Sequence, residues 1–430
     1  MTEEIKQRIE IIKAGKVPVG YKKTQFGVFP DDWVTDKTLG DMFLFYGGLG
    51  ISREQLGSKG IAYLHYGDMH KGTFKKVSYE QYSLLPKYDI QLDGNETFLM
   101  KDGDIAFLDA SEDLEGTSRS VLIDNPDNNF FIAGLHTTLG KSKDDFLDKW
   151  YKQYITTTDV VKKQFQELAV GFKVYGVNRK EITKIVIPCP SKKDEQNRIA
   201  KILSKWDKAI ESQEKLIEKL ELQKKALMQK IFIPSKEWDE RTFKSLYDKA
   251  GEGGTPSTSV AKYYDGGNIP FIKIEHLSHK YIEEVDSYIT KKGLENSGAW
   301  LIPENCILFS NGATIGEVAI NKISVATKQG ILGIVPANNI DVEFLYYYFS
   351  TSYFLSLVAS ITTKGTMPIV YLKDLDKLKI KIPPYEMQKK ISQYISLFDN
   401  EIALNKEKLK SITQQQKAMQ QLLLKGIVRV

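Results

Sequence analysis

The sequence contains few cysteines and no long hydrophobic run. Cys189 and Cys306 are its only cysteines, which excludes a disulfide framework and a cysteine-rich zinc site. No run of about 18 apolar residues is present, so no transmembrane helix is expected. Residues 1–16 form a charged helical pattern without the apolar core of a signal peptide. These absences predict a protein of the reducing cytoplasm.

The sequence also lacks a strong excess of one charge. Its formal net charge is +5, with 27% charged and 42% hydrophobic residues. This composition is typical of a globular protein and favours nucleic-acid binding no more than an ordinary role. A chain of 430 residues is too long for one ordinary core, so several domains are expected.

Convincing catalytic motifs are missing as well. In the segment IPPYE, Ile382 stands where adenine methyltransferases have Asn or Asp, and GLHTTLGKS has one residue too many between its glycines for a P-loop. The histidine pairs His65 with His70 and His276 with His279 have no nearby cysteines. The sequence therefore predicts a binding protein without catalytic residues, a metal site or a cofactor of its own.

What the sequence does contain is an internal repeat. An offset of 192 residues aligns 196–232 with 388–424 and gives nine identities in 37 positions. Both copies carry a spacing of four and three residues that indicates a coiled coil, with polar interruptions at the same two places. The seam positions are Ile199, Leu203, Trp206, Ile210, Gln213, Ile217, Leu220, Lys224 and Leu227 in the first copy, and Ile391, Ile395, Phe398, Ile402, Asn405, Leu409, Ile412, Gln416 and Met419 in the second.

The two helices are expected to pack on each other in an antiparallel coiled coil. Buried polar side chains need partners, and a register in which paired residue numbers sum to 629 matches Gln213 with Gln416 and Lys224 with Asn405. A parallel pairing would match Gln213 with Asn405. The long globular block that precedes each helix favours the antiparallel arrangement.

The repeat extends beyond the helices. Each helix follows a strand-like run that ends in Ile-Pro, and each block follows a proline and an acid-flanked tryptophan, Trp33 or Trp238. Strand-like runs followed by helical patterns predict an α+β or α/β fold for each block. The chain is therefore predicted to be a tandem duplication with an N-terminal helical segment (1–29), a first globular domain (30–189), a central long helix (190–233), a second globular domain (234–384) and a C-terminal long helix (385–430).

Several segments carry a resemblance to a known family. They are GYKKTQFGVFPDDW, DASED, AGLHT, GGTPS, NGATIG, IPCPSKKDEQNRIAKIL and IPPYEMQKKISQYI. The chain resembles, over nearly its full length, the specificity subunit (HsdS) of type I restriction–modification systems. The resemblance implies two target-recognition domains that each read one half of a bipartite DNA site, held apart by the two long helices. The second copy departs slightly, because Met387 separates Glu386 from Gln388.

The resemblance also implies partners. They are double-stranded DNA, two methyltransferase subunits (HsdM) that dock on the long helices, and restriction and translocase subunits (HsdR). Methylation of adenine N6 with S-adenosylmethionine, and cleavage driven by ATP with Mg, would then belong to those subunits. Two alternatives remain: a two-headed coiled-coil adaptor that recognises protein or glycan, and a fused methyltransferase, against which the missing motifs argue.

Residues that contact DNA are expected on exposed loops that offer hydrogen-bond donors and acceptors. In the first domain the candidates are His65, Tyr66, Asp68, Ser111, Glu112, Gly116, Thr117, His136, Thr137, Lys173, Tyr175 and Asn178. In the second they are Thr255, Ser257, Lys273, Glu275, Asn311, Gly312, Thr314, Lys328, Gln329, Lys364 and Thr366. For each of them, a role in forming a turn or capping a helix is the alternative.

Overall fold

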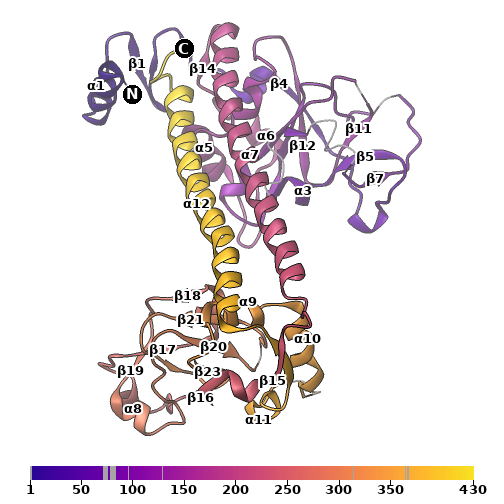
Figure 1. Cartoon of the computed structure of the whole chain (residues 1–430). Helices are drawn as coiled ribbons and strands as arrows, with labels where there is room; N and C mark the ends of the chain where they lie inside the picture. The colour runs from indigo at the N-terminus through magenta and orange to yellow at the C-terminus, as the bar shows by residue number, and fades with distance from the viewer. Residues whose placement is uncertain are drawn as a thin grey trace. The chain divides into compact units, whose positions relative to one another are not determined.

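A computed structural model describes residues 2–70, 76–77, 84–94, 96–127, 129–312, 314–363, 365 and 368–430. The chain forms two compact units, Met1–Ser212 with Leu409–Val430 and Gln213–Lys408 (Figure 1). Each unit contains one domain of mixed helices and strands and part of both long helices, α7 (Lys193–Ile231) and α12 (Tyr385–Leu424). The division between the units thus falls inside the helices and not at the predicted ends of the globular domains.

The first unit contains a five-stranded sheet and a three-stranded sheet. The strand order of the larger sheet is β4 (Phe43–Gly47), β12 (Thr137–Ser142), β8 (Ile105–Leu108), β10 (Ser120–Ile123) and β6 (Lys76–Val77). The smaller sheet contains β11 (Phe131–Ala133), β5 (Ile61–Leu64) and β7 (Lys87–Tyr88). The apolar run IAFL forms β8 because a central strand is covered on both faces, and all four residues are buried.

Shorter elements complete the first unit. Strand β3 (Trp33–Val34) pairs with β14 (Cys189–Pro190), and β9 (Ala110–Ser111) pairs with β13 (Tyr175–Gly176). Its other helices are α1 (Glu3–Lys13), α2 (Leu39–Met42), α3 (Tyr66–His70), α5 (Asp159–Leu168) and α6 (Arg179–Ile182).

The second unit repeats this plan. Its five-stranded sheet has the order β16 (Tyr247–Glu252), β23 (Ile331–Pro336), β20 (Cys306–Ser310), β21 (Val318–Asn321) and β18 (Tyr281–Ile282). Its three-stranded sheet contains β19 (Tyr288–Ile289), β17 (Ile269–Ile272) and β22 (Ala326–Thr327), and β15 (Asp239–Thr242) pairs with β24 (Lys379–Ile382). Its shorter helices are α8 (Lys291–Glu295), α9 (Val342–Phe349), α10 (Ser352–Ile361) and α11 (Leu372–Leu375). The predicted α+β tandem duplication is confirmed.

The two acid-flanked tryptophans lie in the cores of the two units. Trp33 packs with Phe29 in the first core, and Trp238 packs with Phe344 in the second. The N-terminal segment is not wholly helical, as residues 1–29 were expected to be. After α1 the chain forms a hairpin of β1 (Tyr21–Thr24) and β2 (Gly27–Pro30), because Gly27 has a positive φ of 126° that a helix does not permit.

In each unit the long helices run antiparallel, side by side (Figure 1). In the second unit, Gln213 donates to Asn405 (Nε2 to Oδ1, 2.6 Å), and Lys224 contacts Asp399 (Nζ to Oδ1, 2.5 Å). Residue numbers therefore rise along α7 while they fall along α12. None of the eighteen predicted seam residues is exposed.

The predicted register is wrong, although the direction of the helices is right. Lys224 pairs with the carboxylate of Asp399 and not with Asn405, since an ammonium group gains more from a charged acceptor than from an amide. In the first unit Gln416, the repeat equivalent of Lys224, donates to Asp207, the equivalent of Asp399 (3.3 Å). In the second unit the partner of Gln213 is Asn405. The contacts of the aspartates, which lie outside the seam positions, and the Gln213–Asn405 pair together define the register.

A buried glutamine lies in the first turn of each long helix. The side chain of Gln196 accepts a hydrogen bond from the Asp148 N–H (2.7 Å) and donates to the carbonyl oxygens of Pro190 (2.9 Å) and Phe146 (3.3 Å). Gln388 repeats this pattern with the Asp341 N–H and the carbonyls of Pro383 and Asn339. The repeated glutamine thus ties the strand before each helix to a loop of the same unit.

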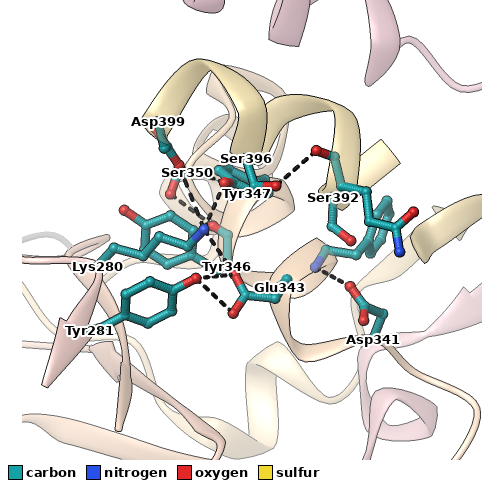
Figure 2. Close-up of polar contacts among 12 residues, drawn as sticks. Lys280, Tyr281, Asp341, Glu343, Tyr346, Tyr347, Ser350, Ser392, Ser396 and Asp399 are labelled. Atoms are coloured by element: carbon teal, nitrogen blue, oxygen red, sulfur yellow. Dashed lines mark hydrogen bonds and ion pairs between the residues drawn. The ribbon is translucent and has the colours of Figure 1, made fainter. Parts of the chain in front are cut away.

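The second unit contains a polar network between α9, α12 and the residue before β18 (Figure 2). Lys280 lies 2.6 Å from the hydroxyl of Tyr347 and 2.8 Å from Glu343, and Tyr347 donates to Asp399 (2.5 Å). Burial, reinforced by this hydrogen bond, raises the pKa of Tyr347. In the first unit Tyr154 likewise donates to Asp207 (2.7 Å), where the partner from α12 is the uncharged Gln416.

Candidate nucleic-acid interface

Three segments of the first unit meet where β8 ends and β12 begins. Asp109 follows β8, and its N–H donates to the carbonyl of His136, the residue before β12 (3.2 Å). The carbonyl of Asp109 accepts from the Val177 N–H, which follows β13 (3.1 Å). These main-chain bonds hold the side chains of Asp109 and His136 at one junction, which we call the first junction.

Aromatic side chains lie beside the first junction. The ring of Tyr66 meets His136 edge to face at 5.3 Å, and the ring of His65 lies 4.5 Å from Tyr66. His136 has a positive φ of 57°, an uncommon conformation for a residue with a side chain. Its side chain is 48% exposed, and its Nδ1 lies 3.4 Å from the carboxylate of Asp109.

Titratable groups at the first junction differ in their surroundings. Burial raises the pKa of Asp109, while the neighbouring His136 and Arg179 oppose that effect. Burial also lowers the pKa of His65, whose Nδ1 accepts the Gly67 N–H (3.1 Å). A cavity of about 430 Å³ adjoins the junction, lined by Asp109, Thr138, Leu168, Val170, Gly176, Val177, Asn178, Arg179 and Glu181.

The second unit has an equivalent junction with the same pattern of main-chain hydrogen bonds. Asn311 follows β20, its N–H donates to the carbonyl of Gly330 (3.0 Å), and its carbonyl accepts from the Val370 N–H (2.9 Å). Gly330 takes the place of His136 and also has a positive φ, of 92°. Asn311 takes the place of Asp109, but its side chain is 1% exposed and donates to the carbonyl of Val370 (3.0 Å).

Several predicted residues of the second unit come together near this junction. Strands β17 and β22 pair in parallel, with Ile272 opposite Thr327, so Lys273 and Lys328 emerge side by side at their ends. The N–H of Gln329 donates to the hydroxyl of Thr255 (3.4 Å). Lys273 also forms an ion pair with Glu275 (3.6 Å). Exposed donors and acceptors therefore gather at the strand ends of this unit, as they do in the first.

Five of the predicted DNA-contacting side chains are buried and do not meet the expectation of exposed donors and acceptors. One of them, His65, is 7% exposed. Ser111, Thr117, Thr137 and Asn311 are each 2% exposed or less. The hydroxyls of Thr117 and Thr137 donate to the nearby carbonyls of Leu114 (2.7 Å) and Gly134 (2.5 Å). These short polar side chains satisfy local main-chain groups and so stabilise turns.

The other candidates occupy varied positions. Exposed among them are Glu112, Lys173, Asn178, Thr255, Ser257, Glu275, Thr314, Lys328 and Gln329, whereas Tyr175, Lys273 and Gly312 are partly buried and Gly116 is buried. Asn178 also caps α6 by accepting the Glu181 N–H (3.1 Å), and Asp68 forms an ion pair with Arg53 (2.5 Å). The remaining two, Lys364 and Thr366, lie outside the described residues.

Sequence reasoning did not select Asp109 or Arg179. Asp109 follows the buried run IAFL directly, and that position at a strand end was the available signal. Arg179 stands at the start of α6, more than 60 residues from Asp109 in sequence. Its approach to Asp109 depends on the pairing of β9 with β13.

Two properties of the described residues bear on the kind of site. Within the ranges that the structure describes, no group of three or more His, Cys, Asp or Glu side chains could hold a metal ion. Among the described helices, none is both long enough and apolar enough to cross a membrane.

Comparison with known proteins identifies the family. A family model described as "Type I restriction modification DNA specificity domain" matches residues 30–222 and 235–414. The chain therefore belongs to the specificity subunits of type I restriction–modification systems. Recognition of DNA is the role of this family, whose members are generally non-catalytic.

Relatives match the chain over different lengths. The putative type I restriction enzyme MjaX specificity subunit of Methanocaldococcus jannaschii is 24% identical over 95% of this chain and 97% of its own length. The MjaIX specificity subunit of the same organism is 34% identical, but the match covers 41% of each chain. The EcoR124I/EcoR124II specificity subunit of Escherichia coli is 26% identical over 50% of this chain and 55% of its own.

Solved structures share the fold. A chain from a structural study of complex assembly and conformational transition of the type I R-M system has a TM-score of 0.61 at 16% identity. The match covers 96% of this chain and 100% of that chain. The S subunit from M. genitalium has a TM-score of 0.51 at 18% identity, and the match covers 91% and 96% of the two chains. At such identities the likeness shows the fold alone.

Proposed function

We propose that this chain reads a bipartite DNA site, with one unit for each half-site, and directs partner subunits to it. The observation that carries the proposal is the pair of equivalent junctions. Their main-chain hydrogen bonds are the same, while the side chains are Asp109 with His136 in one and Asn311 with Gly330 in the other. A duplicated scaffold with different side chains at equivalent strand ends suits the reading of two different sequences.

The partners proposed are two methyltransferase subunits and the restriction and translocase subunits. Methylation of adenine N6 with S-adenosylmethionine, and cleavage with ATP and Mg, would take place on those subunits. The exposed apolar side chains Tyr394, Leu397 and Leu404 on α12 offer a surface for docking a methyltransferase subunit in the second unit.

The direct test is to express the chain with its methyltransferase subunit and map N6-methyladenine across the host genome. The expected result is an asymmetric motif of two parts around a gap of fixed length. A single uninterrupted motif would contradict the division of reading between the two units. Binding of the purified chain to protein or glycan, without salt-dependent and sequence-specific binding to DNA, would favour an adaptor instead.

We also propose that α7 and α12 set the gap between the half-sites, because both helices continue from one unit into the other. Four residues inserted in one helix add about 6 Å of rise and about 40° of rotation. The insertion is expected to lengthen the gap in the methylated motif while both half-sites stay the same. A matched control replaces four exposed residues of the same helix with alanine and leaves the gap unchanged. An unchanged gap in the insertion variant would refute the role of the helices as spacers.

A further inference from the structure

The two junctions differ in what their side chains leave open. In the second unit the amide of Asn311 donates to the Val370 carbonyl, and the side chain is buried. A carboxylate has no proton to donate, so Asp109 cannot make the equivalent bond to Val177. Its side chain lies instead beside His136, remains 31% exposed and lines the cavity of about 430 Å³. The two junctions thus differ at two positions, and the Asp109 side chain faces a cavity whereas that of Asn311 is buried.

Arg179 lines the same cavity from the start of α6. Its guanidinium group lies over Gly47 of β4, where a Cβ atom would come within 2.5 Å of Nη2. A side chain at residue 47 would therefore require the end of the flexible Arg179 side chain to shift. Glu181 also lines the cavity, but it forms an ion pair with Lys184 (2.7 Å). The cavity thus presents a carboxylate acceptor and a guanidinium donor, and His136 supports the carboxylate at 3.4 Å.

We infer that Asp109 and Arg179 form a site that reads one C·G base pair in the half-site recognised by the first unit. In the major groove cytosine presents the N4 amino group as a donor, which suits a carboxylate, and guanine presents O6 and N7 as acceptors, which suit a guanidinium fork. An A·T pair would satisfy the carboxylate but would offer the guanidinium only a weaker match. This inference rests on the proposed reading of DNA by the first unit.

The test compares the methylated motifs of complexes that carry the unchanged chain or the variant Asp109→Asn. Asparagine already occupies the equivalent position of the second unit, so the fold should accept it. The expected motif of the unchanged chain contains a C·G pair that Asp109→Asn relaxes, with discrimination at that position reduced roughly tenfold or more. Arg179→Gln should relax the same position. Asp127→Asn, which removes an exposed carboxylate elsewhere in the unit, is the matched control and should leave the motif unchanged.

The outcomes separate this inference from the proposed function. Absence of a two-part motif for the unchanged chain would overturn both. A two-part motif that stays the same in Asp109→Asn and Arg179→Gln, or that relaxes at an A·T pair or in the other half-site, would overturn only the assignment of these residues. If Asp109→Asn does not assemble with its methyltransferase subunit, Arg179→Gln decides the question. Arg179 is exposed, so its replacement should leave the fold intact.

Discussion

Replacement of the repeated glutamine should destabilise each unit by a similar amount. Gln196 and Gln388 are 0% and 1% exposed, and each makes three hydrogen bonds to main-chain groups. Alanine would remove these bonds and leave main-chain partners without replacements. An unsatisfied buried polar group costs about 1–3 kcal/mol. Water can replace the glutamine at some of its three main-chain partners, so each variant should lose about 3 kcal/mol of unfolding free energy.

Calorimetry and denaturant unfolding measure this loss. For units of roughly 200 residues, about 3 kcal/mol corresponds to a fall in Tm of about 6–12 °C. Hydrogen exchange should locate the change to the start of α7 in Gln196→Ala and to the start of α12 in Gln388→Ala. Gln393→Ala removes an exposed glutamine from the same helix as Gln388 and is the matched control, with an expected change within about 0.5 kcal/mol.

Two results would refute the reasoning. If both buried variants unfold like the control, the hydrogen bonds of the glutamines do not hold the helix starts. If only one variant is destabilised, the two glutamines are not equivalent in energy, even though their bonding partners correspond.

Further predictions concern charged groups. Asp399→Ala should cost about 2 kcal/mol, because it leaves Lys224 without its carboxylate partner and leaves Lys280 with Glu343 alone. Asp207→Ala should cost about 1 kcal/mol, since its partners Tyr154 and Gln416 are neutral. In denaturant unfolding, the difference in lost unfolding free energy between the two variants should be smaller at high salt than at low salt. Equal losses at all salt concentrations would contradict this. Burial raises the pKa of Asp104 to about 6, so the folded state binds a proton more tightly than the unfolded state. Asp104 should therefore reduce stability increasingly as pH rises from about 4 to about 6, and Asp104→Asn should remove this part of the pH dependence; an identical pH profile in the variant would contradict it.

Much of the architecture could be predicted from the sequence because its signals are local or periodic. The seam residues repeat every three or four positions, so their phase shows which face of each helix is buried. Matched strand-like runs and the Ile-Pro steps before both helices indicated the duplication. The hairpin of β1 and β2 was not predicted, since the helical pattern of residues 1–16 was expected to extend to residue 29.

The candidate site was less predictable, because its residues come from segments far apart in sequence. Exposure separates a residue that can contact DNA from one that stabilises a turn, and exposure depends on packing. Thr137 and Asn311 have suitable chemistry for reading DNA, but the structure uses their side chains for bonds to nearby carbonyls. Asp109 and Arg179 are brought together by the pairing of β9 with β13.

The sequence by itself determined the duplication, the seam of the long helices and the family, since each depends on residues in a fixed order or spacing. Only the tertiary structure decided the helix register and the open junction of the first unit. The register follows Asp207 and Asp399, whose partners lie on the other helix. The junctions differ in a side-chain hydrogen bond, because the Asn311 amide donates to the Val370 carbonyl and the Asp109 carboxylate has no proton to donate.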